Sequence, residues 1–459
     1  MLRLRLALAL ASAATALVHP LRGQSAPRLI ASLTTPDTDI AASGAALDSL
    51  VALARRRNSG LGAARARADA ARARIRPAGT RPDPTLTIGV QDLPYRGAPY
   101  ADMFTMNTFR LTQTLPLAGK LGLAERAATG DAAAADAEAE QARLDVTRDV
   151  RQTYYALAFD RRALDIVERN RSVVVSLLHA AQTRYEIGSG ALADVLRARV
   201  AISRLGDQAA TLIADMRAAQ ARLNAILDRP SNTPIDSATV PTRIARLAVP
   251  DSASQVHFAS TSLGAPAAGS PLPSVDSLQA LATAHSPTLR AHDARIAAQE
   301  RRLALAERAT LPDISVSFEY DERPRFPDYL SAFVSIPIPL QKGRTQEDEV
   351  IAARAELAAL RAGQAGEAAA LRAAVAGLAS DAERERTQVA LDVAGVLPEA
   401  RATLQSAGAS YAVGRVDFLT LAAAQTALVE YEVSFYHTLS EFATTLAELE
   451  RVVGTEVVR

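Results

Sequence analysis

The sequence predicts a mainly α-helical protein with a small β part, built as two copies of one unit. Alanine, arginine and leucine dominate the 459 residues, aromatic residues make up only 4%, and tryptophan is absent. This composition favours long helices over a compact sandwich or barrel. Residues 58–90 also align without gaps to residues 286–318, an offset of 286 − 58 = 228, and an offset of 411 − 185 = 226 relates two later motifs. Such self-similarity indicates a repeated structural unit.

The first 25 residues are expected to be a secretory signal peptide. Arg3 and Arg5 form a basic start, and the apolar run Leu6–Val18 is too short to span a bilayer comfortably. Gly23 and Ser25 are small residues that place cleavage near Ser25. No later stretch predicts a transmembrane helix. Cysteine is absent, so we expect no disulfide, no thiol chemistry and no lipidated N-terminal cysteine.

Charge and motifs argue against several classes of function. Lys+Arg (51) and Asp+Glu (50) nearly cancel, so nothing points to a nucleic-acid partner. The sequence contains no H-E-x-x-H, G-x-S-x-G or Walker motif, and its six histidines show no ligand spacing. We therefore predict no enzymatic activity, no cofactor and no metal site.

Each copy is expected to begin with one helix, at about 45–80 within the segment 26–82 and again within 276–310. Both helices are rich in Ala, Arg and Leu and stop at a turn that contains proline, which cannot continue a helix.

A β-hairpin follows each first helix, over residues 83–116 and 311–340. Leu86, Ile88 and Val90 alternate with polar or small residues, and the other three strands alternate in the same way. Strands of about nine to eleven residues cross a bilayer when tilted. Two half-buried hairpins on a soluble domain would give the same pattern, and this alternative stays open.

Both hairpins end on a proline-marked turn. Pro116 and Gly119 lie in "LPLAGKL", and Pro339 and Gly343 lie in "IPLQKGR". Proline stops the strand ladder and glycine permits a sharp change of direction, so these four residues are expected to form the strand-to-helix turns.

A long helical hairpin completes each copy, over 117–228 and 341–454. Residues recur every seven positions in a pattern that is typical of coiled-coil seams. The grid consists of Val150, Leu157, Leu164, Leu178 and Tyr185 in the first copy and of Leu421, Leu428, Phe435, Phe442 and Leu449 in the second. The hairpins are expected to turn at "YEIG" (185–188) and "YAVG" (411–414), where Gly188 and Gly414 allow a positive φ. A Pro- and Ser-rich linker, 229–275, separates the copies, and 455–459 form a short tail.

Four amphipathic strands cannot close a barrel, and an open sheet edge cannot lie in lipid. Closure must come from other copies of the chain. The smallest lipid-embedded barrels have eight strands, so at least two protomers are needed, and three would give twelve.

The twofold repeat, the paired strands, the two proline turns and the two Tyr-x-x-Gly breaks closely resemble the TolC family of outer-membrane efflux proteins, especially its heavy-metal efflux branch. The resemblance spans residues 45–454. It implies a homotrimer with a 12-stranded barrel in outer-membrane lipid and a long α-helical barrel across the periplasm. It also implies two partners, an inner-membrane pump and a periplasmic adaptor that docks on the hairpin tips.

The resemblance places the periplasmic tip, or gate, at a small set of residues: Tyr185, Gly188, Asp194, Tyr411, Gly414, Arg415, Asp417 and Thr420. In relatives, an Asp that matches Asp194 bonds a Tyr that matches Tyr411, together with an Arg that is missing here at Val416, although Arg415 is adjacent. Asp194 and Asp417 would also suit the first turn of a helix without any gating role. Three copies of Asp194 are expected to narrow and charge the mouth.

The expected function is therefore an outer-membrane exit duct, a passive conduit whose cargo is selected by the pump, with metal ions as one candidate cargo. The competing hypothesis is a soluble periplasmic coiled-coil adaptor or structural protein. Drugs and other cargoes also remain open.

Overall fold

The computed structural model describes residues 47–96, 100, 103–235, 238–241, 244, 247–248, 271–338, 344–412 and 414–457. All of them belong to the unit Gly44–Arg459. The expected signal peptide, residues 1–25, lies outside the described residues.

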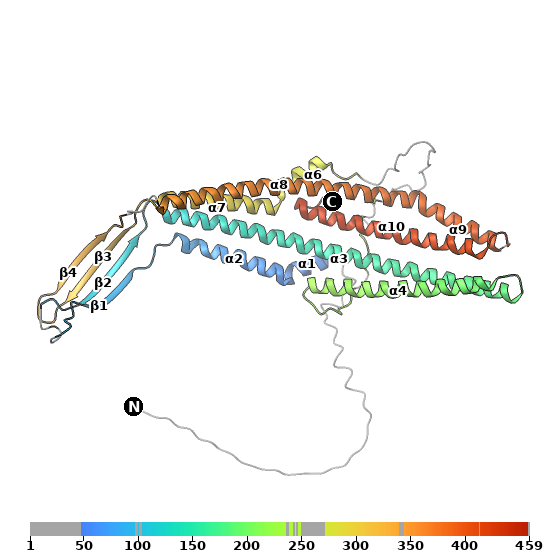
Figure 1. The fold of residues 1–459 in the computed structure, drawn as a ribbon, viewed down its shortest axis with the longest axis horizontal. Helices are drawn as coiled ribbons and strands as arrows, with labels where there is room; N and C mark the ends of the chain where they lie inside the picture. Colours follow the sequence, from blue (N-terminus) through green and yellow to red (C-terminus); the bar gives the residue numbers. More distant parts are fainter. Residues whose placement is uncertain are drawn as a thin grey trace, which may run out of the picture. The chain divides into compact units, whose positions relative to one another are not determined.

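The elements follow the same order in both copies (Figure 1). The first copy contains α1 (Leu47–Arg57), α2 (Ser59–Gly79), β1 (Thr85–Gln91), β2 (Met106–Leu115), α3 (Lys120–Glu186) and α4 (Leu192–Ile226). The second contains α6 (Val275–His285), α7 (Pro287–Arg308), β3 (Ile314–Glu322), β4 (Tyr329–Ser335), α8 (Gln346–Leu391), the π-helical turn η3 (Asp392–Val396), α9 (Leu397–Ala412) and α10 (Phe418–Val453). This order confirms the predicted internal repeat.

The prediction of a single first helix in each copy is wrong. In both copies this segment forms two helices, and a capping residue separates them. The Asn58 side chain accepts a hydrogen bond from the Leu61 amide at 2.9 Å and so starts α2. At the matching place in the second copy, Ser286 caps α7 and Pro287 occupies its first turn. A side chain that bonds its own backbone ends one helix and begins the next.

The four strands form one antiparallel sheet in the order β1-β2-β3-β4. Its register aligns apolar and aromatic side chains across the four strands: Ile88 is paired with Phe109, Phe109 with Tyr320, and Tyr320 with Leu330. The central strands have the predicted length, 10 and 9 residues, whereas β1 and β4 have only 7. Among the described residues, each of these outer strands is paired on one side only.

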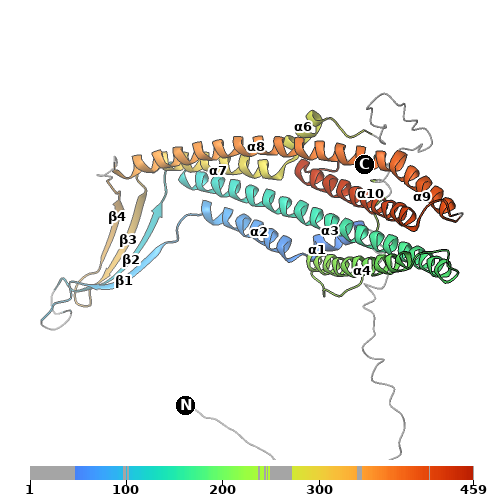
Figure 2. The ribbon, with the colours of Figure 1, turned by 45° about the vertical axis from the view of Figure 1, so that its right-hand side comes forward.

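The helices form one layer around α3. Near the sheet, α3 packs between α2 and α7, and α7 packs on α8. Towards the other end of α3, its neighbours are α4 and α10, and α10 packs on α9. Figures 1 and 2 show the same order from two directions. The outer positions of the layer are therefore α2 with α4 on one side and α8 with α9 on the other.

The two long helices of the repeat differ. Helix α3 is continuous for 67 residues, about 100 Å at 1.5 Å per residue. In the second copy the π turn separates α8 from α9, and the Leu397 amide bonds the Asp392 carbonyl five residues back. Pro398 follows directly and has no amide hydrogen for a helical bond. A wider turn before a proline relieves the clash that a regular helix would have there.

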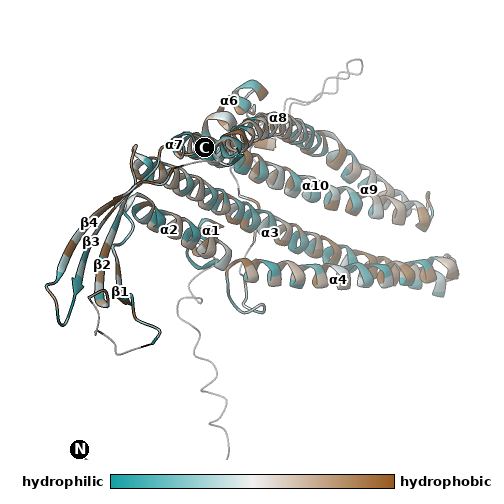
Figure 3. Cartoon of the chain, turned by 60° about the vertical axis from the view of Figure 1, so that its left-hand side comes forward, coloured by the Kyte–Doolittle hydropathy of each residue, from teal (hydrophilic) through white to brown (hydrophobic). Residues whose placement is uncertain are grey.

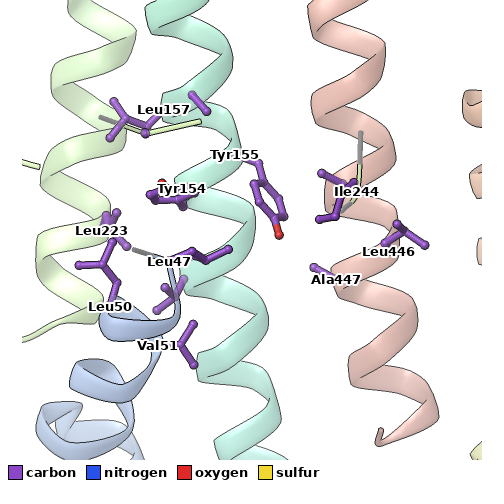
Figure 4. Packing of buried hydrophobic residues seen from close by; sticks show 14 of the residues in the cluster. Leu47, Leu50, Val51, Tyr154, Tyr155, Leu157, Leu223, Ile244, Leu446 and Ala447 are labelled. Carbon is purple, nitrogen blue, oxygen red and sulfur yellow. The ribbon is translucent and has the colours of Figure 1, made fainter. Parts of the chain in front are cut away.

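The main hydrophobic core lies where α1, α3, α4 and α10 meet. Figure 4 shows Leu50 and Val51 of α1 near Tyr154 and Tyr155 of α3, with side chains from α4 and α10 in the same cluster. Polar contacts also join α3 to α10: the amide of Gln425 donates to Asn170 at 2.7 Å, and buried Arg151 pairs with Glu450. These contacts fix the two copies side by side.

The predicted seven-residue seam is right for α10 and only partly right for α3. Leu421, Leu428 and Leu449 are buried as expected. In α3 the grid residues Leu164 and Leu178 are only half-buried, and a different set is buried instead: Ala163, Val167, Asn170, Val174 and Ala181. A straight α-helix drifts by about 20° per heptad, so its buried stripe leaves a strict seven-residue grid.

Candidate functional site

The sheet exposes apolar side chains on one face and buries several polar side chains of its two central strands on the other. On one face Ile88 is 64% and Leu330 81% exposed, whereas on the other Glu319 is only 5% and Asp321 4% exposed. Figure 3 shows hydrophobic and hydrophilic segments recurring along the strands. A water-soluble sheet would bury the first face, so this arrangement suits a sheet whose apolar face meets lipid and whose polar face meets water.

Polar side chains link β2 to β3 along the covered face. The Thr108 hydroxyl donates to Asp321 at 2.8 Å, and the Arg110 guanidinium pairs with Glu319. Two hydroxyl pairs continue the row, Thr112 with Ser317 at 2.9 Å and Thr114 with Ser315 at 3.2 Å. Sequence reasoning identified the alternation but not these partners, because they lie about 200 residues apart in the chain.

The turn after β2 is tied to the turn before β3. Gly119 has φ = +70° and precedes α3, as glycine permits. The Lys120 ammonium donates to the Asp313 carboxylate at 2.7 Å, and the Leu117 amide bonds the same carboxylate. Pro116 lies between β2 and this turn. The sequence singled out Pro116 and Gly119 but missed Lys120 and Asp313; the predicted Pro339 and Gly343 lie outside the described residues.

The first Tyr-x-x-Gly stretch ends α3 in a Schellman motif. Gly188 has φ = +74°, its amide bonds the Tyr185 carbonyl at 3.0 Å, and the Ser189 amide bonds the Arg184 carbonyl at 2.8 Å. These are the two hydrogen bonds that define the motif. The Tyr185 side chain is 47% exposed, so the expectation that it continues the helical seam is wrong.

The second stretch repeats the motif at the end of α9. Gly414 has φ = +76°, its amide bonds the Tyr411 carbonyl at 3.0 Å, and the Arg415 amide bonds the Ser410 carbonyl at 2.9 Å. The Tyr-x-x-Gly spacing therefore has a backbone cause, because the tyrosine carbonyl accepts a hydrogen bond from the amide of the glycine three residues later. The positive φ expected at both glycines is confirmed.

Gly188→Ala is expected to destabilise the protein by about 1 kcal/mol, because an L-residue with a side chain is strained at positive φ. A Cβ at Gly188 would meet nothing within 4 Å, so backbone strain alone is tested. Gly206→Ala is the control: Gly206 lies inside α4 with open space around it, and alanine there should stabilise by about 0.5–1 kcal/mol. Thermal unfolding of the detergent-solubilised protein measures both, and equal signs would contradict the motif.

Asp417 begins α10. Its carboxylate accepts from the Thr420 amide at 2.9 Å and from the Thr420 hydroxyl at 2.6 Å. The hydrogen bonds from the Thr420 side chain and amide lower the pKa of Asp417 below its usual range. Asp417 and Thr420 thus form an N-cap in which a charged acid is favoured.

The predicted acid–tyrosine pair does not form in this structure. The Asp194 carboxylate lies 3.5 Å from Arg197 on its own helix, and no hydrogen bond among the described residues joins it to Tyr411. Tyr411 instead lies beneath the guanidinium of Arg184, whose Cζ is 4.7 Å from the ring centre. Sequence reasoning missed Arg184. Its place one residue before Tyr185 was the only available signal.

A cavity of about 450 Å³ lies between the two turns and is lined by four of the eight predicted tip residues. Its lining includes Arg184, Gly188, Asp194, Tyr411 and Asp417. The structure thus brings both turns of one chain to a single polar cavity that carries two carboxylates and one guanidinium. The predicted Tyr185 and Arg415 are chain neighbours of the lining residues Arg184 and Val416, whereas Gly414 and Thr420 are two residues away from the lining.

Two acidic residues lie close together between α3 and α4. Burial and the neighbouring Asp215 carboxylate raise the pKa of Asp160 from 3.8 to about 6. The folded protein therefore favours the protonated form, and this contribution to stability is full below about pH 4 and is lost as the pH rises through 6.

Asp160→Asn stays neutral at every pH and is therefore expected to raise the thermal midpoint, by about a few degrees, at pH 7.5 but not at pH 4. Midpoints of both proteins in detergent at pH 4, 5, 6 and 7.5 test this. Parallel pH profiles for the variant and the unaltered protein would refute it.

Two kinds of site are absent from the described residues. No group of three or more His, Asp or Glu side chains there is arranged to hold a metal ion. In the same part of the chain, every helix is too short or too polar to cross a bilayer.

Comparisons with known proteins agree on the fold. Residues 50–229 match the family described as outer membrane efflux protein. The outer-membrane channel OprN superposes with a TM-score of 0.73 at 19% identity, over 90% of this chain and 91% of that chain. CusC, whose structures concern folding and transmembrane channel formation, gives 0.73 at 16%, over 89% and 92%. The outer membrane protein VceC from Vibrio cholerae gives 0.71 at 18%, over 90% and 96%. No curated protein sequence matches. The chain has the fold of these channels.

Proposed function

We propose that this chain forms the outer-membrane exit duct of a tripartite efflux system. The starting point is the match of residues 50–229 to the outer membrane efflux protein family. The observation that carries the proposal is the inverted sheet, with apolar side chains exposed on one face and acids covered on the other. A sheet of this kind is stable where lipid surrounds it and water fills the space it encloses.

The unpaired edges support assembly from several copies. Both β1 and β4 have an unpaired side in the described chain, and backbone groups left unpaired in lipid cost several kcal/mol each. Pairing β4 of one copy with β1 of the next satisfies both edges. Three copies give a 12-stranded barrel, which is within the range of membrane barrels.

The helix layer has the same pair of open sides. Helices α2 and α4 follow the β1 side, and α8 and α9 follow the β4 side. One rotation that joins the sheet edges therefore also brings the outer helices of neighbouring copies together. The homotrimer then continues its barrel as a helical tube in the periplasm.

The two turns of each chain would form the periplasmic mouth of this tube. Six turns would surround one opening, and Tyr185, Gly188, Asp194, Tyr411, Gly414, Arg415, Asp417 and Thr420 would lie at or beside it. The three copies of Asp194 would narrow and charge the opening. Unchanged conductance and ion selectivity of Asp194→Ala would exclude that role.

The duct itself needs no energy source. A periplasmic adaptor would dock on the turns, and an inner-membrane pump would deliver the cargo and drive its movement. Metal ions are one proposed cargo.

Fractionation and planar-bilayer recording test the proposal together. The protein should pellet with the outer membrane, require detergent for release, migrate as a trimer when unheated, and give discrete conductance steps in a lipid bilayer. A monomer in the soluble periplasmic fraction, with no conductance, would instead favour an adaptor or structural protein.

A further inference from the structure

We propose that Arg184 clamps the two turns of each protomer together and thereby holds the mouth in its closed state. This inference rests on the proposed channel function. Arg184 lies in the last turn of α3, and its guanidinium reaches across to the last turn of α9, in the other copy of the repeat. It is a positioning residue, because its contacts are with the second turn and not with any cargo.

Three contacts engage the guanidinium. Its Nη1 donates to the Tyr411 carbonyl at 3.1 Å, and its Cζ lies over the Tyr411 ring at 4.7 Å from the centre. Its Nη2 lies 3.6 Å from the place where a Cβ on Gly414 would stand, so it packs directly against the glycine of the second turn. One planar group thus holds the carbonyl, the ring and the glycine of the same Schellman motif.

The end of α9 favours a positive charge. The last carbonyls of a helix carry partial negative charge and lack helical partners, and an arginine that donates to one of them is stabilised. The ring adds a cation–π contact on the other side. Tyr411 is held in turn by Phe418, the first residue of α10, with ring centres 6.1 Å apart. The clamp therefore connects α3 to both helices of the second hairpin.

The first turn is shaped to leave room for this side chain. A Cβ on Gly190 would come within 2.9 Å of the Arg184 Cβ and within 3.0 Å of its carbonyl carbon. Glycine at 190 lets the loop fold back closely over the base of Arg184. The position is not duplicated: the residue that matches Arg184 in the second copy, at the offset of 226, is Ser410.

The Arg184 clamp differs from an acid–tyrosine latch, a hydrogen bond between Asp194 and the Tyr411 hydroxyl, in whether that hydroxyl is needed to keep the mouth closed. Stacking uses the ring and the main-chain carbonyl, so removal of the hydroxyl should have no effect. A latch from Asp194 would need the hydroxyl. Tyr411→Phe and Tyr411→Leu therefore separate the two, because phenylalanine keeps the aromatic face and leucine does not.

The experiment is single-channel recording of the purified full-length trimer in planar bilayers. Arg184→Gln and Tyr411→Leu are each expected to raise the ratio of open to closed time about fivefold or more, in the range for loss of one cation–π contact. Arg184→Lys keeps the charge without the planar fork and should lie between them and the unaltered protein. Tyr411→Phe should match the unaltered protein, and so should Arg199→Gln, which removes a charge from an exposed position on α4.

The double variant Arg184→Gln/Tyr411→Leu should open no more than Arg184→Gln alone, because the arginine variant already removes the contact that Tyr411→Leu removes. Unaltered gating in Arg184→Gln, or opening in Tyr411→Phe, would overturn the clamp while leaving the channel intact. Should Arg184→Gln fail to assemble, the same decision is made on Tyr411→Leu against Tyr411→Phe. If the unaltered trimer forms no pore, the proposed function itself fails.

Discussion

Replacement of Leu111 by arginine is expected to abolish most of the proposed trimer. Leu111 lies in the middle of β2, about half exposed, and is paired with Leu86 and Phe318 on the apolar face. An arginine on the lipid face of a barrel costs about 2–4 kcal/mol near the bilayer centre. A trimer carries three copies, so the total of about 6–12 kcal/mol is comparable with the stability of a whole domain. The heat-sensitive trimer band and the outer-membrane fraction measure the loss.

The adjacent residue supplies the control. Thr112→Arg introduces the same side chain one position along the strand, on the covered polar face, where Thr112 bonds Ser317. Its cost should be small, because a barrel interior is polar and wide enough for water. Equal loss of trimer in both variants would show that the two faces have similar surroundings, which contradicts a lipid-facing sheet.

Phe442→Ala is expected to destabilise the helical part by about 3–5 kcal/mol. Phe442 is fully buried in the core shared by α3, α4 and α10, and truncation leaves a cavity that rigid helices cannot close. Phe442→Leu keeps most of the volume and should cost less than about 1.5 kcal/mol. Urea-induced unfolding in detergent, followed by circular dichroism, compares the two. A similar loss in both would mean that the aromatic ring itself, and not its volume, is required.

Much of the fold was predictable because its signals are local. The duplicated order of elements, the strand alternation at Leu86 and Ile88, and the helix ends at Gly188 and Gly414 all follow from residues within a few positions of one another. The division of the first helices was equally local, at Asn58 and at Ser286 followed by Pro287, but the high content of helix-forming residues around them obscured it. Capping competes with propensity, and here capping prevailed.

The contacts at the tip and along the barrel wall could not be derived in this way. Arg184 and Tyr411 are 227 residues apart, and Arg110 and Glu319 are 209 apart. Each pair exists because the two copies lie side by side, with β2 paired to β3 in the sheet and α3 packed against α10 in the helical part. The Asp194–Tyr411 pair that the resemblance implies is absent from this structure: both residues line one cavity, yet the Asp194 carboxylate lies near Arg197 on its own helix.

The π turn between α8 and α9 makes the second long arm of the chain, α8 with α9, easier to bend than the first arm, α3. Helix α3 has an unbroken series of hydrogen bonds, so a force applied at its turn is transmitted along it as through a stiff rod. In the second arm, Pro398 lacks an amide hydrogen directly after the widened turn at Asp392–Val396, so resistance to bending is lowest there. A load shared by the two turns of one protomer would bend the second arm at this point and leave the first straight. Hydrogen exchange should therefore be fastest, within the long helices, at residues 392–398.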